Sequence, residues 1–176
     1  MTFTIEDWGT DDIINSTDII ERHSELEDEL ETLLDDVDNA AEMFTSQREH
    51  CAVYGTSQNP DEIAELYRLR NVWDAAMQLM ERWRAENQAE LNALQAICKL
   101  GEGYGDWSHG DVLISEDYFT KYIEELIGDC YEMPKGFDSN AWPWRHMKID
   151  YEAAAEEAKS DYVEIECNGH TYSFRA

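Results

Sequence analysis

The chain has 176 residues, of which 43% are hydrophobic and 11% aromatic, so it can bury a real core in one domain, with or without an appendage. Its 40 acidic residues against 13 Lys and Arg give a formal net charge of −27. That charge argues strongly against direct binding to nucleic acid, which depends on neutralising phosphates, and against an anionic membrane surface.

Residues 1–15 are expected to form a short irregular arm, pinned by Trp8, Ile13 and Ile14. The chain does not begin with a basic region followed by an apolar one, so no signal peptide is expected. No apolar run approaches the ~18 residues of a membrane span. The cysteines are scattered without metal-binding spacing, so we expect reduced thiols in a cytoplasm and no metal site: Cys51, Cys98, Cys130 and Cys167.

Residues 16–100 are predicted to form two long helices folded back as an antiparallel coiled coil. The first has a seam of residues spaced alternately by four and three: Ile19, His23, Leu26, Leu30, Leu33, Val37, Ala40 and Phe44. The second repeats the pattern at Leu66, Leu69, Trp73, Ala76, Met80 and Trp83. The sequence Ser16-Thr17-Asp18 predicts an N-cap, Gly55 a stop, and Asn59-Pro60-Asp61-Glu62 a restart with a capping box.

Residues 101–176 are predicted to form a small acidic α+β domain. After the glycine-rich connection GEGYGDW, Ser115 is expected to cap a helix that runs to about Ile127 and is closed by Gly128. A second helix is expected from Asp150 to about Lys159, followed by a β-hairpin turned at Asn168-Gly169. The predicted fold class is therefore α+β and mostly α: a long helical hairpin, two helices and a C-terminal β-hairpin.

The negative charge is unevenly distributed along the chain. Residues 1–58 carry 16 acidic and 2 basic residues, residues 59–100 carry 7 and 5, and residues 101–176 carry 17 and 6. The excess therefore belongs to the first helical arm and to the C-terminal domain, whereas the second arm is nearly neutral.

On the first arm, the outermost heptad position is acidic in every heptad: Glu21, Asp28, Asp35, Glu42 and Glu49. Glu25, Glu31 and Asp38 lie beside this stripe. Residues 21–42 contain ten carboxylates and one base, Arg22, over about 33 Å of helix. One strand of B-DNA of that length holds about ten phosphates. These acids are therefore predicted to mimic phosphates.

Two plainer interpretations of the stripe are a solvated coiled-coil exterior and a general adaptation to salt. A solvated helix face normally mixes Glu with Lys, yet lysine is absent from residues 1–98. Arg84 on the second arm is expected to pair with Glu27, which would neutralise little of the stripe.

The C-terminal domain carries a family resemblance. The segments EGYGDWSHGDVLISEDYFTKYIEELIGDC and WPWRHMKIDYEAAAEEAKSDYVEIECNGHTYSFR, within residues 102–175, resemble the C-terminal part of ArdA-type antirestriction proteins. The hairpin before them resembles the front half of a phage-borne variety. The resemblance implies inhibition of restriction enzymes by DNA mimicry, often as elongated homodimers. The acids in matching positions are Glu116, Asp117, Glu124, Glu125, Asp129, Asp150, Glu152, Glu156, Glu157 and Asp161, of which Asp150 is equally a candidate helix cap.

No catalytic site and no cofactor are expected. The pairs Glu124-Glu125 and Glu156-Glu157 are adjacent in sequence, so on a helix their side chains point about 100° apart. The function predicted from the sequence is inhibition of a bacterial DNA-binding defence enzyme, a restriction-modification complex or a CRISPR effector, in the cytoplasm of the host cell. The alternative is a coiled-coil adaptor or assembly protein of a phage or mobile element, binding through Trp83, Trp142 or the seam.

Overall fold

The computed structural model describes residues 11–54, 59–132, 135–136, 138, 140–167 and 169–176. The chain is a mostly helical α+β protein, as predicted. It divides into two compact units, one of Glu21–Gln95 and one that joins the start of the chain, up to Ile20, to Ala96–Ala176. In the described part of the chain, no helix combines the length and apolar character needed to cross a membrane.

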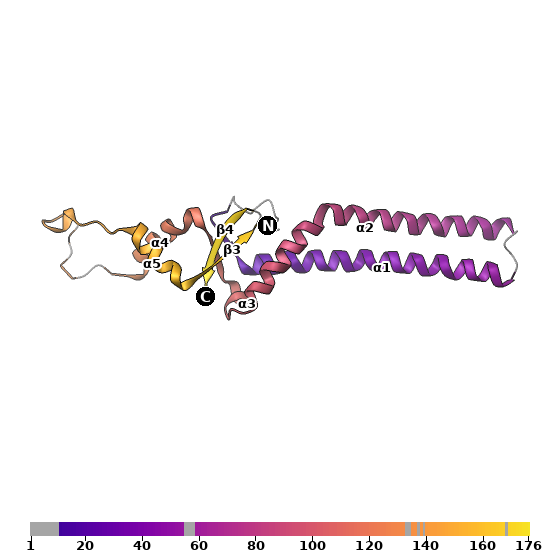
Figure 1. The fold of residues 1–176 in the computed structure, drawn as a ribbon, viewed down its shortest axis with the longest axis horizontal. Helices are drawn as coiled ribbons and strands as arrows, with labels where there is room; N and C mark the ends of the chain where they lie inside the picture. Colours follow the sequence, from indigo (N-terminus) through magenta and orange to yellow (C-terminus); the bar gives the residue numbers. More distant parts are fainter. Residues whose placement is uncertain (1–10, 55–58, 133–134, 137, 139, 168) are drawn as a thin grey trace. The chain divides into compact units, whose positions relative to one another are not determined.

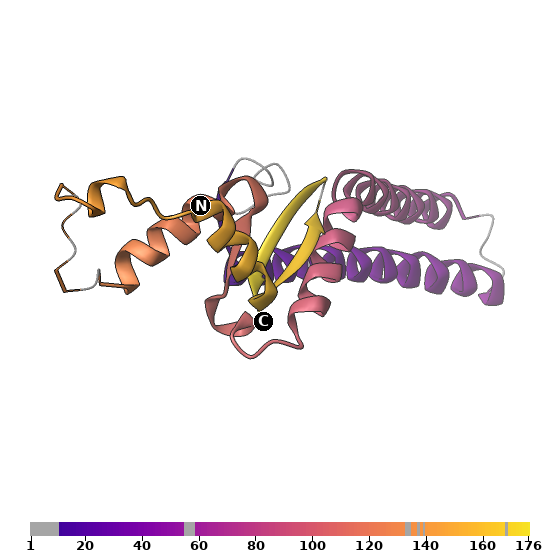
Figure 2. The ribbon, with the colours of Figure 1, turned by 60° about the vertical axis from the view of Figure 1, so that its left-hand side comes forward.

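Glu21–Gln95 is an antiparallel helical hairpin, and this confirms the seam prediction. It is built from α1 (Ser16–Tyr54) and α2 (Pro60–Gly101), which lie side by side (Figures 1 and 2). The seam residues are buried or half-buried, and Leu26, Leu69 and Met80 are almost fully buried. The rings of Phe44 and Trp73 stack across the hairpin at a centroid distance of 5.8 Å. The alternating spacing of three and four thus determines which side of each helix is buried.

The two helix starts differ in how well they were predicted. Helix α2 begins as expected: Pro60 is its first residue, and the Asn59 side chain accepts the backbone N–H of Asp61 at 3.1 Å. Helix α1 begins at Ser16, but its cap is Asn15, whose Oδ1 accepts the backbone N–H of Thr17 at 2.9 Å. The predicted cap at Ser16 is wrong because that hydroxyl is buried and donates to the Trp107 carbonyl at 2.6 Å.

The other unit contains a four-stranded antiparallel sheet in the order β1-β2-β4-β3. Its strands are β1 (Ile13–Asn15), β2 (Val112–Ser115), β3 (Tyr162–Cys167) and β4 (His170–Arg175). The predicted β-hairpin is β3 and β4, with Gly169 at a φ of +81° in its turn. The expectation of an irregular arm is wrong for residues 13–15, because β1 pairs with β2. Trp8 lies outside the described residues.

Short helical segments belong to the same unit as this sheet. They are α3 (Trp107–Gly110), α4 (Glu116–Cys130), α5 (Tyr151–Ala158) and the 3-10 turns η2 (Trp144–His146) and η3 (Lys159–Asp161). Helix α4 was expected to run to about Ile127 and to be closed by Gly128, but it continues through Gly128 to Cys130. Asp150 is a helix cap, since its side chain accepts the backbone N–H of Ala153 at 3.0 Å. Ser115 precedes α4 but forms no side-chain cap hydrogen bond. Phe119, Ile123 and Ala155 bring α4 and α5 onto Ile114 of β2.

Candidate functional site

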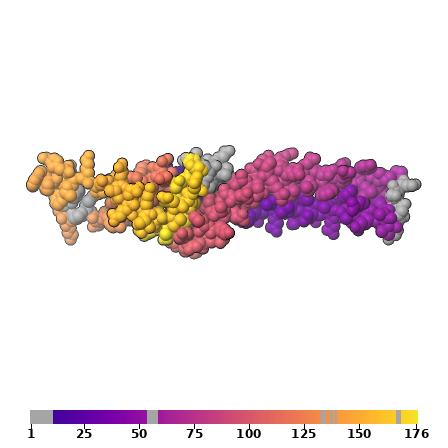
Figure 3. All heavy atoms as spheres, viewed as in Figure 1, coloured from indigo at the N-terminus to yellow at the C-terminus, as the bar shows by residue number. Residues whose placement is uncertain are grey.

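The predicted phosphate-mimicking residues of the first arm lie along α1 in the structure. Six of them are exposed: Glu21, Asp28, Glu31, Asp35, Asp38 and Glu42. Glu25 is half-buried. Because α1 turns its seam toward α2, the outermost heptad position faces away from the hairpin core. Figure 3 shows one face of the molecule, on which atoms of both helices reach the surface along their length. We call the seven residues the acidic stripe.

Few of the carboxylates of this arm are neutralised. Of the ten between Glu21 and Glu42, Glu25 pairs with Arg22, Glu27 lies 3.4 Å from His23 Nδ1, and Glu29 accepts the indole N–H of Trp83 at 2.8 Å. Among the described residues, the carboxylates of the other seven form no ion pair and accept no hydrogen bond: Glu21, Asp28, Glu31, Asp35, Asp36, Asp38 and Glu42. The stripe therefore keeps most of its formal charge.

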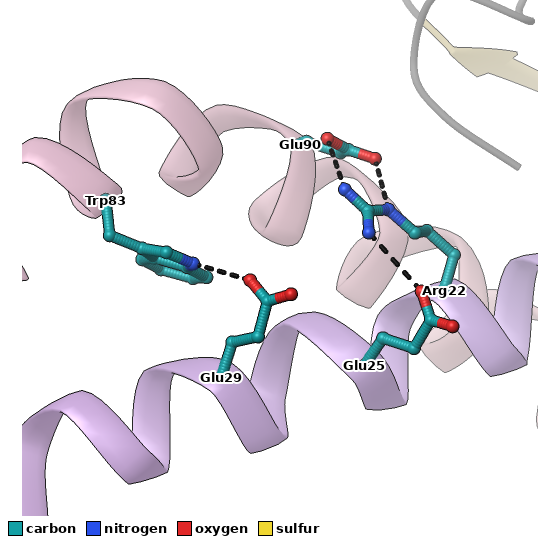
Figure 4. A network of polar contacts seen from close by, with 5 residues as sticks. All are labelled: Arg22, Glu25, Glu29, Trp83 and Glu90. Atoms are coloured by element: carbon teal, nitrogen blue, oxygen red, sulfur yellow. Dashed lines mark hydrogen bonds and ion pairs between the residues drawn. The ribbon is translucent and has the colours of Figure 1, made fainter. Parts of the chain in front are cut away.

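The single base within this arm segment, Arg22, is directed to the other helix (Figure 4). Its Nε donates to Glu90 Oε1 at 3.0 Å and its Nη2 to Glu90 Oε2 at 3.4 Å, while Nη1 donates to Glu25 at 3.3 Å. The hydrogen bond to Glu90 is the main reason why the pKa of Arg22 is raised above its ordinary value. Arg22 therefore pairs mainly with Glu90, which is 7% exposed, and of the acidic stripe it contacts Glu25 alone among the described residues.

This ion pair gives a prediction for stability. Arg22→Met keeps most of the aliphatic stem but leaves the Glu90 carboxylate buried without its partner, so we expect the free energy of unfolding to fall by about 2 kcal/mol. Urea unfolding measures the change. Arg70→Met is the matched control, because the Arg70–Asp74 ion pair is long at 3.8 Å and both side chains are more than half exposed. Equal losses in the two variants would contradict the prediction.

The expected pairing of Arg84 with Glu27 is not found among the described residues. The Glu27 carboxylate lies beside His23 Nδ1 instead. Trp83, a candidate for partner binding, is half-buried and bonded to Glu29 within the hairpin. The cross-helix pairs Arg22–Glu90 and Glu29–Trp83 were missed by the sequence analysis. The signal for the first was weak: the α2 seam loses its regularity at Asn87, near Glu90.

The acids predicted in the C-terminal domain are all exposed, but they do not form one uniform surface: Glu116, Asp117, Glu124, Glu125, Asp129, Glu156, Glu157 and Asp161. Glu156 and Glu116 converge on the Lys159 ammonium at 3.2 and 3.8 Å, and the hydrogen bond to Glu156 is the main cause of the raised pKa of Lys159. Glu125 accepts the hydroxyl hydrogen of Tyr118 at 2.9 Å. The structure therefore brings Glu116 and Glu156 together, but around a lysine.

The charge spacing on α1 is the distinctive geometric property of this site. Residues seven apart on a helix are separated by about 10.5 Å along the axis, and the acids beside the outermost position fill the intervals. Ten carboxylates over about 33 Å match the charge per length of one DNA strand. Because the groups are held by a continuous helix packed along its seam, their order is set before any partner arrives.

The described residues contain no group of three or more His, Cys, Asp or Glu side chains that could hold a metal ion. No family model matches the chain, and neither a curated protein nor a solved structure matches it. The function is therefore inferred from the charge and geometry of the acidic surfaces.

Proposed function

We propose that the protein is a DNA mimic that occupies the DNA-binding groove of a bacterial defence enzyme, either a restriction-modification complex or a CRISPR effector. The observation that carries the proposal is the acidic stripe of α1, which is exposed, largely unneutralised and spaced like backbone phosphates. A groove lined with Lys and Arg to hold DNA would accept such an array. The protein acts by binding and performs no chemistry of its own, in the cytoplasm of the host cell.

The rigid helix is an advantage over a disordered acidic tail. Ordering a flexible chain on binding costs free energy, whereas the hairpin presents its carboxylates already aligned. The large negative field also steers a basic partner toward the protein and raises the association rate, more strongly at low salt than at high salt. The resemblance of residues 102–175 to ArdA-type proteins is consistent with this mechanism.

The proposal is tested by capture and competition. The immobilised protein is exposed to a bacterial lysate, and bound proteins are eluted either with salt or with duplex DNA. We expect the captured proteins to be DNA-binding enzymes, released by both treatments. With a purified captured enzyme, the protein should displace a fluorescent duplex, and its affinity should fall by about tenfold or more between low and high salt. An enzyme that binds the protein and the duplex together would overturn the proposal.

A second candidate function is that of an adaptor or assembly protein, and it is favoured by one observation. Trp142 is 75% exposed. A tryptophan exposed to that degree is a frequent anchor in protein interfaces. This function predicts captured proteins that resist both salt and duplex DNA and are lost with Trp142→Ala. Release by DNA together with normal capture by Trp142→Ala would exclude it.

A further inference from the structure

A groove on the helical hairpin is lined by residues of both arms, near the end of α1 and the start of α2. Its volume is about 260 Å³, and six residues line it: Phe44, Arg48, Ile63, Leu66, Tyr67 and Arg70. The two α1 residues are one helical turn apart. The four α2 residues lie at i, i+3, i+4 and i+7, so they share one side of that helix. We call this site the arginine groove.

The groove lies where the seam of α1 becomes polar. Beyond Phe44, the next two seam positions hold Gln47 and Cys51 in place of large apolar residues. The Gln47 side-chain amide donates to Cys51 Sγ at 3.8 Å, so these side chains are engaged with each other. A polar and a short side chain cover less apolar surface than two leucines would, and Ile63 and Leu66 on α2 remain only half-buried.

Two aromatic rings form part of the groove walls. Phe44 is held in place by stacking on Trp73 at a centroid distance of 5.8 Å, so its ring is positioned before a ligand arrives. Tyr67 is 64% exposed, which leaves much of its surface available for contact. A flat aromatic body in the groove would pack against these rings and would also cover Ile63 and Leu66.

The charged groups of the groove are arginines, although the whole chain carries −27. Arg48 forms no ion pair among the described residues. It shares residues 1–58 with one other Lys or Arg, and that residue, Arg22, is directed to Glu90. Arg70 lies 3.8 Å from Asp74, and both side chains are more than half exposed, so this pair leaves the guanidinium accessible. The groove therefore offers two guanidinium groups to an anion.

Neighbouring acids do not occupy these guanidinium groups from within the groove. Among the described residues, no Asp or Glu lines it. Glu65 is held by Arg68, whose Nε and Nη2 donate to it at 2.7 and 2.6 Å. Glu49 follows Arg48 in sequence, so on the helix its side chain points about 100° away. More distant acids are screened beyond about 8 Å at physiological ionic strength, and the arginines dominate the field inside the groove.

We propose that the arginine groove binds a small aromatic acid, a molecule with a flat apolar body and one carboxylate group. The carboxylate accepts hydrogen bonds from Arg48 and Arg70, whose planar guanidinium groups match its geometry. A neutral aromatic molecule would leave both guanidinium groups without a partner, and a small hydrophilic anion would leave Ile63 and Leu66 uncovered. The groove volume of about 260 Å³ lies just below the roughly 300–1,000 Å³ of sites for drug-sized ligands, which limits the ligand to a small one.

Equilibrium dialysis of the full chain against naphthoate tests the proposal, with naphthalenemethanol as a neutral counterpart that has the same rings. We expect naphthoate to bind saturably, at one molecule per chain, with a dissociation constant on the order of 100 µM. Naphthalenemethanol should bind at least tenfold more weakly, because it offers no charge to the arginines. A lack of saturable naphthoate binding, or equal affinities of the two molecules, would overturn the proposal. This comparison uses the unaltered protein and depends on no variant.

A double variant tests the location of the site. Arg48→Gln with Arg70→Gln should weaken naphthoate binding at least tenfold and leave naphthalenemethanol binding unchanged. Arg82→Gln with Arg84→Gln is the matched control, because these arginines are exposed on α2 outside the groove and their loss changes the net charge equally. The control should bind naphthoate almost as the wild-type protein does. Circular dichroism verifies that both variants remain helical.

Equal losses in the two double variants would show that net charge, rather than the groove, attracts the acid, and would overturn the proposal. The inference does not depend on DNA mimicry, because neither Arg48 nor Arg70 belongs to the acidic stripe. A protein that displaces duplex DNA but binds no naphthoate would remove the arginine groove alone. A protein that binds naphthoate but displaces no DNA would support the groove and remove the mimicry.

Discussion

Replacing four acids of the stripe with their amides is expected to abolish binding to the DNA-binding partner while the fold stays intact. The changes are Asp28→Asn, Asp35→Asn, Asp38→Asn and Glu42→Gln, all at exposed positions without an ion pair among the described residues. If each carboxylate meets one base of the groove and contributes roughly 1 kcal/mol, the loss is about 4 kcal/mol, or about a thousandfold in affinity. Displacement of a labelled duplex from the partner enzyme measures it.

The same variant should be at least as stable as the wild-type protein. Asp28 and Glu31, Asp35 and Asp38, and Asp38 and Glu42 are like-charged neighbours on one helix side, and each such pair costs a few tenths of a kcal/mol. Neutralising four acids relieves this repulsion, so the melting temperature should be unchanged or higher. Affinity and stability thus move in opposite directions, which separates loss of binding from loss of fold.

The control removes four charges elsewhere. Asp61→Asn, Asp74→Asn, Glu81→Gln and Glu102→Gln change the net charge equally but leave the acidic stripe complete. These positions are exposed on α2 and just after it. We expect a modest loss of affinity, because the weaker negative field steers the partner less effectively. We expect no loss of inhibition when the protein saturates the partner enzyme. Equal losses in both variants would mean that net charge, rather than the spacing on α1, carries the binding.

The sequence was sufficient to predict the hairpin because its determinants are local. Alternating spacings of three and four fix the buried side of each helix, and Asn59 with Pro60 fixes where α2 begins. The β-hairpin around Gly169 was equally predictable, since its strands are neighbours in sequence. The exposure of Asp28, Asp35 and Glu42 followed from the same periodicity, because the outermost heptad position is opposite the seam.

Features that depend on distant pairing were not predictable in this way. Strand β1 has three residues and is stable only because it pairs with β2, about a hundred positions later. Serine is a common helix-capping residue, yet the Ser16 hydroxyl donates to the backbone carbonyl of Trp107, which is 91 positions away in sequence. The contact of Glu116 with Lys159 likewise requires α4 and α5 to be adjacent, whereas the pair of Glu156 with Lys159 is local. The arrangement of the acids on α1 was easier to predict than that of the acids in the C-terminal domain, because the α1 acids lie on a single helix.

The second large effect is expected at Gly101, the last residue of α2. A Cβ added there would lie 2.1 to 2.6 Å from three ring atoms of Trp107, a side chain that is 3% exposed and packs edge-on against Phe174 at 5.4 Å. The indole cannot move aside without disturbing this packing. Alanine normally stabilises a helix relative to glycine by up to about 1 kcal/mol. Helix propensity alone therefore predicts that Gly101→Ala raises the free energy of unfolding, whereas the steric clash predicts that it lowers it.

We expect the clash to dominate, and Gly101→Ala to lower the free energy of unfolding by about 3 kcal/mol, at the upper end of the cost of overpacking a core. Urea unfolding at several temperatures measures it. Gly105→Ala is the control, because no heavy atom lies within 4 Å of the added Cβ there, and it should have little effect. Trp107→Leu creates room for the methyl group, so Gly101→Ala should cost much less in that background. An unchanged cost in the double variant would show that the backbone, rather than the indole, excludes a side chain at Gly101.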